Sequence, residues 1–202
     1  MTVPRQRNDA RAPYGLDDIV DIAVGVFLER GYDGTSMGDL AKAADITKSS
    51  FYYHVTSKEE LFERGVGRAL DALFGVLDEP GSLRGTAIER IRHIVRRTVE
   101  IVTERLPEVA LLVRTHGKTE AEKRALERRR EFDRTMTRLT RQAVRDGDLR
   151  ANLDPGLFTR LVLGMAVSVV EWYRPEGKVR ATVLVDAVEA LVFDSPLWSP
   201  DA

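Results

Sequence analysis

The chain has no cysteine among its 202 residues and only three histidines. Disulfides, thiol catalysis and thiolate metal sites are therefore excluded. The three histidines, His54, His93 and His116, stand far apart, and no Ser-His-Asp order, glycine-rich phosphate loop or metal-ligand spacing accompanies them. We therefore expect no catalytic residues, no metal site and no cofactor.

The chain also lacks a long apolar run and an N-terminal signal segment. Its longest apolar stretch, Leu161–Val170, is too short to span a bilayer. The first 15 residues carry Arg5, Arg7 and Arg11 with no apolar run after them, which is unlike a secretory signal. These observations predict a cytoplasmic protein with no membrane partner.

Charge of one sign is not in excess either, because the formal net charge is −1. Bulk electrostatics therefore does not indicate nucleic-acid binding, and any DNA affinity has to come from a local patch. One candidate is a flexible basic arm over residues 1–15, whose arginines could enter a minor groove. A solvated tail is the alternative.

The most informative stretch that the chain does contain is residues 35–61. Ser36 is placed to cap a first short helix, with Asp39 three residues later as in a capping box. Asp45 is one of the few residue types that tolerate a left-handed turn, and Thr47 is placed to cap a second helix. Two short helices around a tight turn, followed by a longer helix, are typical of a helix-turn-helix DNA reader.

The second helix of this pattern carries residue types that contact DNA. Its first exposed residues are small or cationic hydrogen-bonding groups, which suit a helix N-terminus inserted into a major groove. The next helix has Ser57 and Glu60 as a second capping box, and Lys58 in its first turn calls for a nearby anion, such as a DNA phosphate. The expected DNA contacts are Thr35, Thr47, Lys48, Ser49, Ser50, Tyr52, Tyr53, His54 and Lys58.

Over residues 16–65 the chain resembles the N-terminal domain of the TetR family of bacterial transcriptional regulators. The positions that match are Gly31, Thr35, Ala41, Ala44, Tyr52, Ser57, Lys58, Glu59 and Leu61. Two positions depart from the pattern, since Asp45 stands where the family usually has Gly and Val55 where it usually has Phe. The resemblance implies a DNA-binding domain over residues 16–60 and a ligand-binding and dimerisation domain over 61–202. A helical domain with an accidental helix-turn-helix pattern is the alternative.

The rest of the chain shows helical periodicity and almost no strand alternation, so we expect an all-α fold. The predicted helices cover residues 17–30, 57–77, 82–105, a short segment from 107, 119–146, 157–173 and 179–193. The fifth of these carries a basic run from Lys123 to Arg130, which we interpret as a solvated face rather than a second nucleic-acid site.

The last two predicted helices are unusually apolar. Residues 157–173 are apolar on nearly every side, and residues 179–193 carry a broad apolar stripe. One core does not readily cover both, so a homodimer is expected, with intramolecular packing as the alternative. The TetR resemblance implies that these helices form a four-helix dimer interface, to which we assign Gly164, Leu184, Val188 and Leu191.

The larger domain is expected to enclose an apolar pocket between its helices. The candidate wall residues are Val99, Leu112, Arg114, His116, Phe132, Met136, Met165, Val169, Trp172 and Arg174. Plain core packing is the alternative and the more frequent explanation for each, because an apolar residue at helical spacing needs no ligand to explain it. Residues 171–175, Glu-Trp-Tyr-Arg-Pro, resemble the Trp-Tyr-x-Pro ending of TetR regulators of fatty-acid and steroid catabolism, some of which respond to acyl-CoA. This implies an anionic head group near Arg174, with an aromatic cap on the dimer interface as the alternative.

The sequence therefore predicts a transcriptional regulator that binds a double-stranded DNA operator, a repressor released by a small apolar or acyl-CoA-like effector. The ligand would favour a state in which the two recognition helices no longer match successive major grooves, about 34 Å apart. The alternatives are an architectural DNA-binding protein without an effector and an enzyme on an all-helical scaffold.

Overall fold

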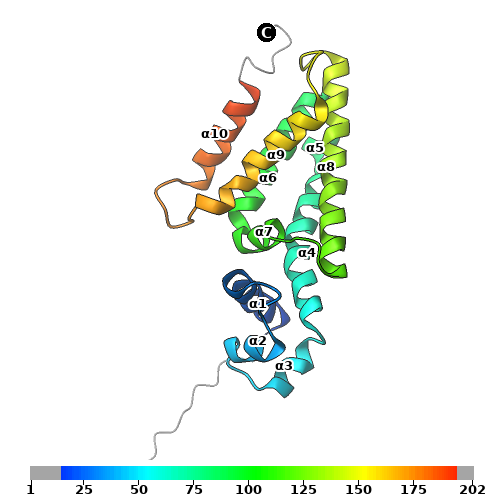
Figure 1. Ribbon diagram of the computed structural model, residues 1–202. Helices are drawn as coiled ribbons and strands as arrows, with labels where there is room; N and C mark the ends of the chain where they lie inside the picture. Colours follow the sequence, from blue (N-terminus) through cyan, green and yellow to red (C-terminus); the bar gives the residue numbers. More distant parts are fainter. Residues whose placement is uncertain (1–14, 195–202) are drawn as a thin grey trace, which may run out of the picture.

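The computed structural model describes residues 15–194, and within that range it consists of helices and their connections, with no β-strand (Figure 1). The helices are α1 (Leu16–Arg30), α2 (Met37–Ala43), α3 (Lys48–His54), α4 (Lys58–Val76), α5 (Pro80–Leu83), α6 (Ala87–Glu104), α7 (Leu106–Val113), α8 (Glu120–Asp146), α9 (Pro155–Trp172) and α10 (Ala181–Phe193). The expected all-α fold is confirmed. The predicted arm over residues 1–15 lies, except for Gly15, outside the described residues.

The ends of the two short helices follow the local chemistry of the sequence. The Ser36 hydroxyl accepts a hydrogen bond from the Asp39 backbone N–H at 3.2 Å, and the Asp39 carboxylate accepts one from the Ser36 N–H at 2.9 Å. Thr47 caps α3 through the N–H of Ser50 at 3.2 Å. Asp45 has a φ of 54°, the left-handed conformation expected for this turn. The helix-turn-helix geometry is therefore encoded within about twenty residues.

The capping box predicted for α4 is only half present. The Ser57 hydroxyl accepts from the Glu60 N–H at 3.1 Å, as expected. The Glu60 carboxylate, however, accepts from the backbone N–H and the hydroxyl of Thr56, at 2.9 and 2.8 Å, instead of from the Ser57 N–H. These hydrogen bonds to Thr56 lower the pKa of Glu60. Thr56, one residue before Ser57, therefore takes the place of Ser57 as the donor to the Glu60 carboxylate.

The predicted helix over residues 82–105 begins later than expected. Pro80 instead starts the one-turn helix α5, and Gly85, with a φ of 93°, separates it from α6. Thr86 and Glu89 then form a complete capping box at the start of α6. A Thr-x-x-Glu signal was therefore present in the sequence, at residues 86–89, and the helix boundary follows it. Helix α10 likewise begins at Ala181 rather than at residue 179.

Two apolar clusters fill the molecule, and α4 contributes to both. The first cluster joins α1, α2, α3 and the beginning of α4 to Leu111 and Leu112 of α7 and to Ala121 and Ala125 of α8. The second lies among the rest of α4 and α6, α8, α9 and α10. In Figure 1, α4 runs from the unit formed by α1–α3 into the larger bundle. The predicted boundary at residue 60 therefore falls within the first turn of a helix that connects both parts.

Helix α9 is long and apolar enough to cross a membrane, judged by length and composition only, over the 18 residues Pro155–Trp172. That span is longer than the ten-residue apolar stretch noted in the sequence, because Arg160 is the only charged residue between Pro155 and Val170. In the structure α9 packs against α6 and α8. Core helices of soluble proteins pass the same test, so this one helix is weak evidence for a membrane.

Candidate DNA-binding surface and ligand cavity

Helix α3 is anchored by one face and exposes the other. Phe51 is fully buried in the first apolar cluster, and Val55 directly after the helix is buried beside it. Tyr53 is 88% exposed, and His54 packs edge-on against it with ring centroids 5.6 Å apart. The exposed predicted contacts on and beside α3 are Thr47, Lys48, Ser49, Ser50, Tyr52 and Tyr53. A short helix presenting hydroxyls, an amine and phenol rings to solvent suits base edges and phosphates.

The side chain of Lys48 lies along α2, at Gly38. A Cβ atom on Gly38 would stand 3.0 Å from Lys48 Cε and 3.3 Å from its Nζ. The absence of a side chain at Gly38 thus leaves the space that the lysine occupies. Lys48 is exposed nevertheless, so its ammonium group remains accessible to an anion.

Lys58 has an internal partner that the sequence did not predict. Its Nζ donates to the backbone carbonyl of Tyr32 at 2.8 Å and lies 4.2 Å from the centre of the Tyr32 ring. The carbonyl oxygen and the ring face give this cation neutral partners with partial negative charge, not the anion that was expected. The contact fastens the start of α4 to the segment after α1, and Lys58 remains only partly buried.

Thr35 does not lie on the DNA-facing surface, which corrects one expected contact. Its side chain is buried, and its hydroxyl donates to the carbonyl of Gly31 at 2.8 Å. The hydroxyl thus satisfies the carbonyl group of Gly31 directly after α1. Its role is to fix the connection between α1 and α2.

A cavity of about 300 Å³ lies in the larger bundle, lined by residues of α4, α6, α7, α8 and α9. Its walls are mostly apolar and include two predicted residues, Leu112 and Phe132. The other apolar wall residues are Leu73, Val102, Val109, Val113, Leu163 and Val167. Gly164 of α9 also borders the cavity, and no heavy atom lies within 4 Å of the position its Cβ would occupy. Such an apolar enclosure between helices is a common form of small-molecule site.

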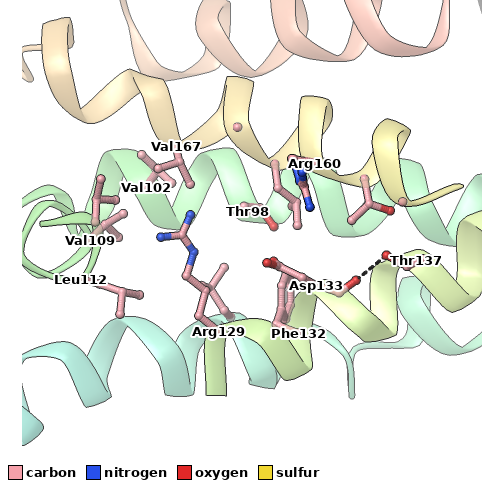
Figure 2. A pocket seen from close by; sticks show the side chains of 16 residues that line it. Thr98, Val102, Val109, Leu112, Arg129, Phe132, Asp133, Thr137, Arg160 and Val167 are labelled. Atoms are coloured by element: carbon pink, nitrogen blue, oxygen red, sulfur yellow. Dashed lines mark hydrogen bonds between the residues drawn. The ribbon is translucent and has the colours of Figure 1, made fainter. Parts of the chain in front are cut away.

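Three charged residues, none of them predicted, line this apolar cavity. Figure 2 shows the guanidinium groups of Arg129 from α8 and Arg160 from α9 pointing into the same space, with the side chain of Asp133 between them in this view. Within residues 15–194 none of the three forms an ion pair. Burial raises the pKa of the Asp133 carboxyl, and the two arginines act in the opposite direction. The cavity therefore offers two cations and one partly desolvated acid.

Several predicted wall residues belong to the core rather than to the cavity lining. Val99, Met136 and Val169 are almost completely buried within the second apolar cluster, and Met165 packs against that cluster. Their helical spacing indicated an apolar face correctly. Core packing is therefore sufficient to explain all four.

The predicted polar wall residues lie elsewhere, which corrects the expected site of a head group. Arg114 and His116 border a different recess, between α1 and the segment after α7. Trp172 is 52% exposed at the end of α9. Arg174 is exposed in the following turn, where its guanidinium donates to the Tyr173 carbonyl at 2.8 Å. Trp172 and Arg174 therefore both lie outside the cavity lining.

The sequence contained a signal for the missed cations. Arg160 is the single charge in the otherwise apolar first four turns of α9, and a lone charge on such a helix indicates a polar site. Arg129 stands three residues before Phe132 and thus on the same helix face. Its neighbours in the basic run are neutralised on the surface, since Arg124 pairs with Glu63 and Arg128 with Asp71.

The expected dimer residues divide between the core and the surface. Leu184 and Val188, four residues apart on one face of α10, are buried in the second apolar cluster. Both side chains are therefore used in the core of the single chain and offer little surface to a partner. Gly164 and Leu191 are exposed, and Leu191 at 65%. The large exposed apolar residues on and beside α9 and α10 are Leu157, Leu161, Trp172, Val179, Val183 and Leu191.

Helix α7 connects the cavity to the helix-turn-helix unit. Leu112 lines the cavity and also belongs to the apolar cluster around α1 and α3. Directly after α7, the Arg114 guanidinium donates to the carbonyl of Leu28 at 3.1 Å. Lys118 pairs with Asp33 at 2.8 Å. A shift of α7 would therefore act on both ends of the molecule.

Comparison with known families identifies two matching regions. Residues 84–195 match the model of the tetracycline repressor-like C-terminal domain, and residues 19–64 match the model of bacterial regulatory proteins of the tetR family. A similar solved structure is a member of the TetR transcriptional regulator family from Streptomyces coelicolor A3. It is 54% identical, with a TM-score of 0.83, and the alignment covers 91% of this chain and 92% of that one.

More distant relatives have more specific names. The transcriptional repressor KstR2 of Rhodococcus jostii is 28% identical over 203 residues, covering 99% of both chains. The structure of AibR in complex with isovaleryl coenzyme A and operator DNA has a TM-score of 0.75 at 24% identity, covering 88% of this chain and 97% of that one. At that identity the likeness of AibR establishes a shared fold.

Proposed function

Because the chain belongs to the TetR family of bacterial DNA-binding transcriptional regulators, we propose that it is an operator-binding repressor released by a short acyl-CoA thioester. One observation carries the proposal: the apolar cavity with Arg129 and Arg160 in its wall reaches α7, the helix that also packs on the helix-turn-helix unit.

The DNA-binding surface is formed by α3 and its caps. Lys48 and Tyr53 stand at opposite ends of the exposed face, where the side chains can reach base edges and phosphates. Ser49 and Ser50 offer hydroxyls between them. Lys58 serves both parts, because one hydrogen of its ammonium group is bound to the Tyr32 carbonyl and two remain for a phosphate.

The effector is an acyl-CoA because the cavity is small, has mostly apolar walls and carries two arginines. A volume of about 300 Å³ is at the lower end of ligand pockets and admits a short acyl chain but not the whole coenzyme. The arginines suit the phosphates or the polar arm of coenzyme A. The isovaleryl-CoA complex of AibR, a protein of the same fold, supports this ligand class.

The repressor acts as a dimer through the exposed faces of α9 and α10. Leu157, Leu161, Gly164, Ser168 and Trp172 follow one another at spacings of three or four residues, which gives one stripe on α9. Val183 and Leu191 continue the apolar surface on α10. A surface of this kind favours a second copy of the chain, because a C2 pair places two recognition helices one DNA turn apart.

The dimer face has a direct test. Leu161→Glu with Leu191→Glu is expected to give a folded monomer, since both side chains are exposed and the new charges would be buried only in a dimer. Leu184→Glu is the contrast, because a charge at this buried position should unfold the domain. Sedimentation with circular dichroism separates the two effects. A folded dimer of the double variant would place the interface elsewhere.

Effector release is tested on the operator obtained by selection from random duplexes. Operator-bound protein is titrated with isovaleryl-CoA, octanoyl-CoA, coenzyme A, the free acids and neutral hydrophobes, with anisotropy as readout. We expect the acyl-CoA thioesters to release the DNA and the free acids to be much weaker. Release by neutral compounds alone would contradict the acyl-CoA assignment, and tight binding without sequence preference would favour an architectural protein.

A further inference from the structure

A second recess lies on the other side of α8 from the effector cavity. It has a volume of about 500 Å³ and is bordered by Leu77 directly after α4 and by residues of α5, α6 and α8. Four arginines line it, Arg90 from α6 and Arg138, Arg141 and Arg145 from α8. None of the lining residues is acidic.

These four arginines are not neutralised within residues 15–194, where none of them takes part in an ion pair. Arginines elsewhere on α8 behave differently, since Arg128 pairs with Asp71 and Arg134 pairs with Glu127. The chain as a whole carries a net charge of −1. A concave site with four unpaired guanidinium groups is therefore a local exception to the charge balance of the protein.

Two of the guanidinium groups are held in place by the protein. Arg90 Nε donates to the carbonyl of Ser82 at 2.7 Å, and the buried Ser82 hydroxyl donates to the carbonyl of Val76 at 2.6 Å. Arg138 Nη2 donates to the Thr135 hydroxyl at 2.9 Å. Each group keeps further N–H donors for a ligand, because a guanidinium has five. Positioning before binding reduces the entropy that a ligand has to offset.

We propose that this recess binds an organic phosphate with two or more phosphate groups, of the nucleoside diphosphate or triphosphate class. The arginines supply charge-assisted and bidentate hydrogen bonds to the phosphate oxygens. Half-buried Leu77 supplies an apolar edge within the same recess, whereas Ile94 and Leu139 are themselves buried, so the arginines rather than an apolar wall carry the recognition of the ligand. This site is separate from the proposed effector cavity and does not depend on the identity of that effector.

The position of the recess favours a small phosphate over a nucleic acid. The C-terminal half of α8 lies at the end of the bundle away from α1–α3, as Figure 1 shows, so an operator held by α3 does not reach it. Arg90 comes from α6 and the other three arginines from α8, so the charges border the recess from two helices rather than from one alone.

The test measures binding of ATP and of pyrophosphate to the full-length protein by isothermal titration calorimetry. Wild-type protein is expected to bind ATP saturably, with an affinity that falls as salt rises. Arg141→Gln with Arg145→Gln should weaken ATP binding at least tenfold. Arg134→Gln is the matched control on the same helix and should change it less than twofold. Thermal unfolding followed by circular dichroism verifies that each variant is folded.

Other outcomes overturn the proposal. Absence of saturable ATP binding would do so, as would equal binding by wild-type and the Arg141/Arg145 variant. Binding of heparin or non-operator duplex without binding of ATP would identify a nucleic-acid surface instead. ATP binding that is lost in an Arg129→Gln/Arg160→Gln variant would place the nucleotide in the effector cavity. Should the double variant not fold, Arg141→Gln and Arg145→Gln are measured singly and each is expected to weaken ATP binding by at least threefold.

Discussion

Helix α3 and the proposed effector cavity draw their polar groups from different kinds of structure. The polar side chains of α3 lie within residues 47–54 and face solvent. Those of the cavity, Arg129, Asp133 and Arg160, come from two helices and border a mostly apolar cavity, with Arg129 and Asp133 partly buried and Arg160 exposed. The first surface is defined by local caps and one buried anchor, Phe51, whereas the second exists only after distant helices pack. Substitutions should therefore act independently at the two sites unless they touch α7.

The largest expected effect is on DNA binding alone. Lys48→Ala and Tyr53→Ala should each weaken specific operator binding by roughly ten- to a hundredfold, since one base or phosphate contact contributes about 1 to 3 kcal/mol. Both side chains are exposed, so the fold and acyl-CoA affinity should not change. Lys178→Ala, an exposed lysine between α9 and α10, is the control. Fluorescence anisotropy measures the operator affinity. An unchanged affinity in both variants would mean that α3 does not contact the operator.

Substitutions in the cavity should weaken effector binding and leave DNA binding unchanged. Arg129→Gln with Arg160→Gln is expected to weaken acyl-CoA binding by at least about tenfold, because each hydrogen bond to a charged group contributes about 1.5 to 3 kcal/mol. Operator affinity without effector should stay within about twofold. Arg174→Gln is the matched control, since that arginine lies outside the cavity. Calorimetric titration measures the acyl-CoA affinity. A larger loss of affinity in Arg174→Gln would indicate that the head group binds at the end of α9.

A smaller effect concerns stability and tests whether the cavity acid is desolvated. Burial raises the Asp133 pKa in the folded state, so stability is lost as pH rises through this raised pKa and the carboxylate forms. Asp133→Asn should therefore be more stable than wild type at pH 7, by on the order of 1 kcal/mol. The difference should shrink toward pH 4. Denaturant unfolding at both pH values provides the measurement, with exposed Glu131→Gln as control; a less stable variant at pH 7 would mean that the two arginines outweigh burial.

The smallest expected effect concerns Lys58. If two of its ammonium hydrogens face a phosphate, Lys58→Ala lowers the slope of log affinity against log salt by about 0.9. Because Lys58 also holds the Tyr32 carbonyl, the variant should lose some thermal stability as well. An unchanged slope with lowered stability would assign Lys58 a structural role only.

The comparison also explains what the sequence could predict. The helix-turn-helix followed from Ser36, Asp45 and Thr47 because caps and a left-handed turn are set by neighbouring residues. Buried Thr35 was misassigned because its hydroxyl partner, the Gly31 carbonyl, depends on how the loop between α1 and α2 folds. The family resemblance and the all-α fold were confirmed for the same reason, since both rest on patterns that are local in the chain.

The cavity was predictable only in part, because its walls depend on helix rotation and on which helices meet. Leu112 and Phe132 were identified by their apolar spacing, but that spacing did not separate cavity walls from core residues such as Val99 and Met136. The broad stripe of α10 left the same ambiguity. Leu184 is buried in the second apolar cluster and Leu191 is exposed to solvent, although both belong to one apolar helix.

The central claim, that effector and operator oppose each other through one dimer, has a direct measurement. The affinity of isovaleryl-CoA is determined by calorimetry for the free protein and for the protein saturated with operator. If acyl-CoA weakens operator binding by a given factor, operator has to weaken acyl-CoA binding by the same factor. We predict a reduction of at least tenfold in the operator complex. Equal acyl-CoA affinity for free and operator-bound protein would contradict the proposed release.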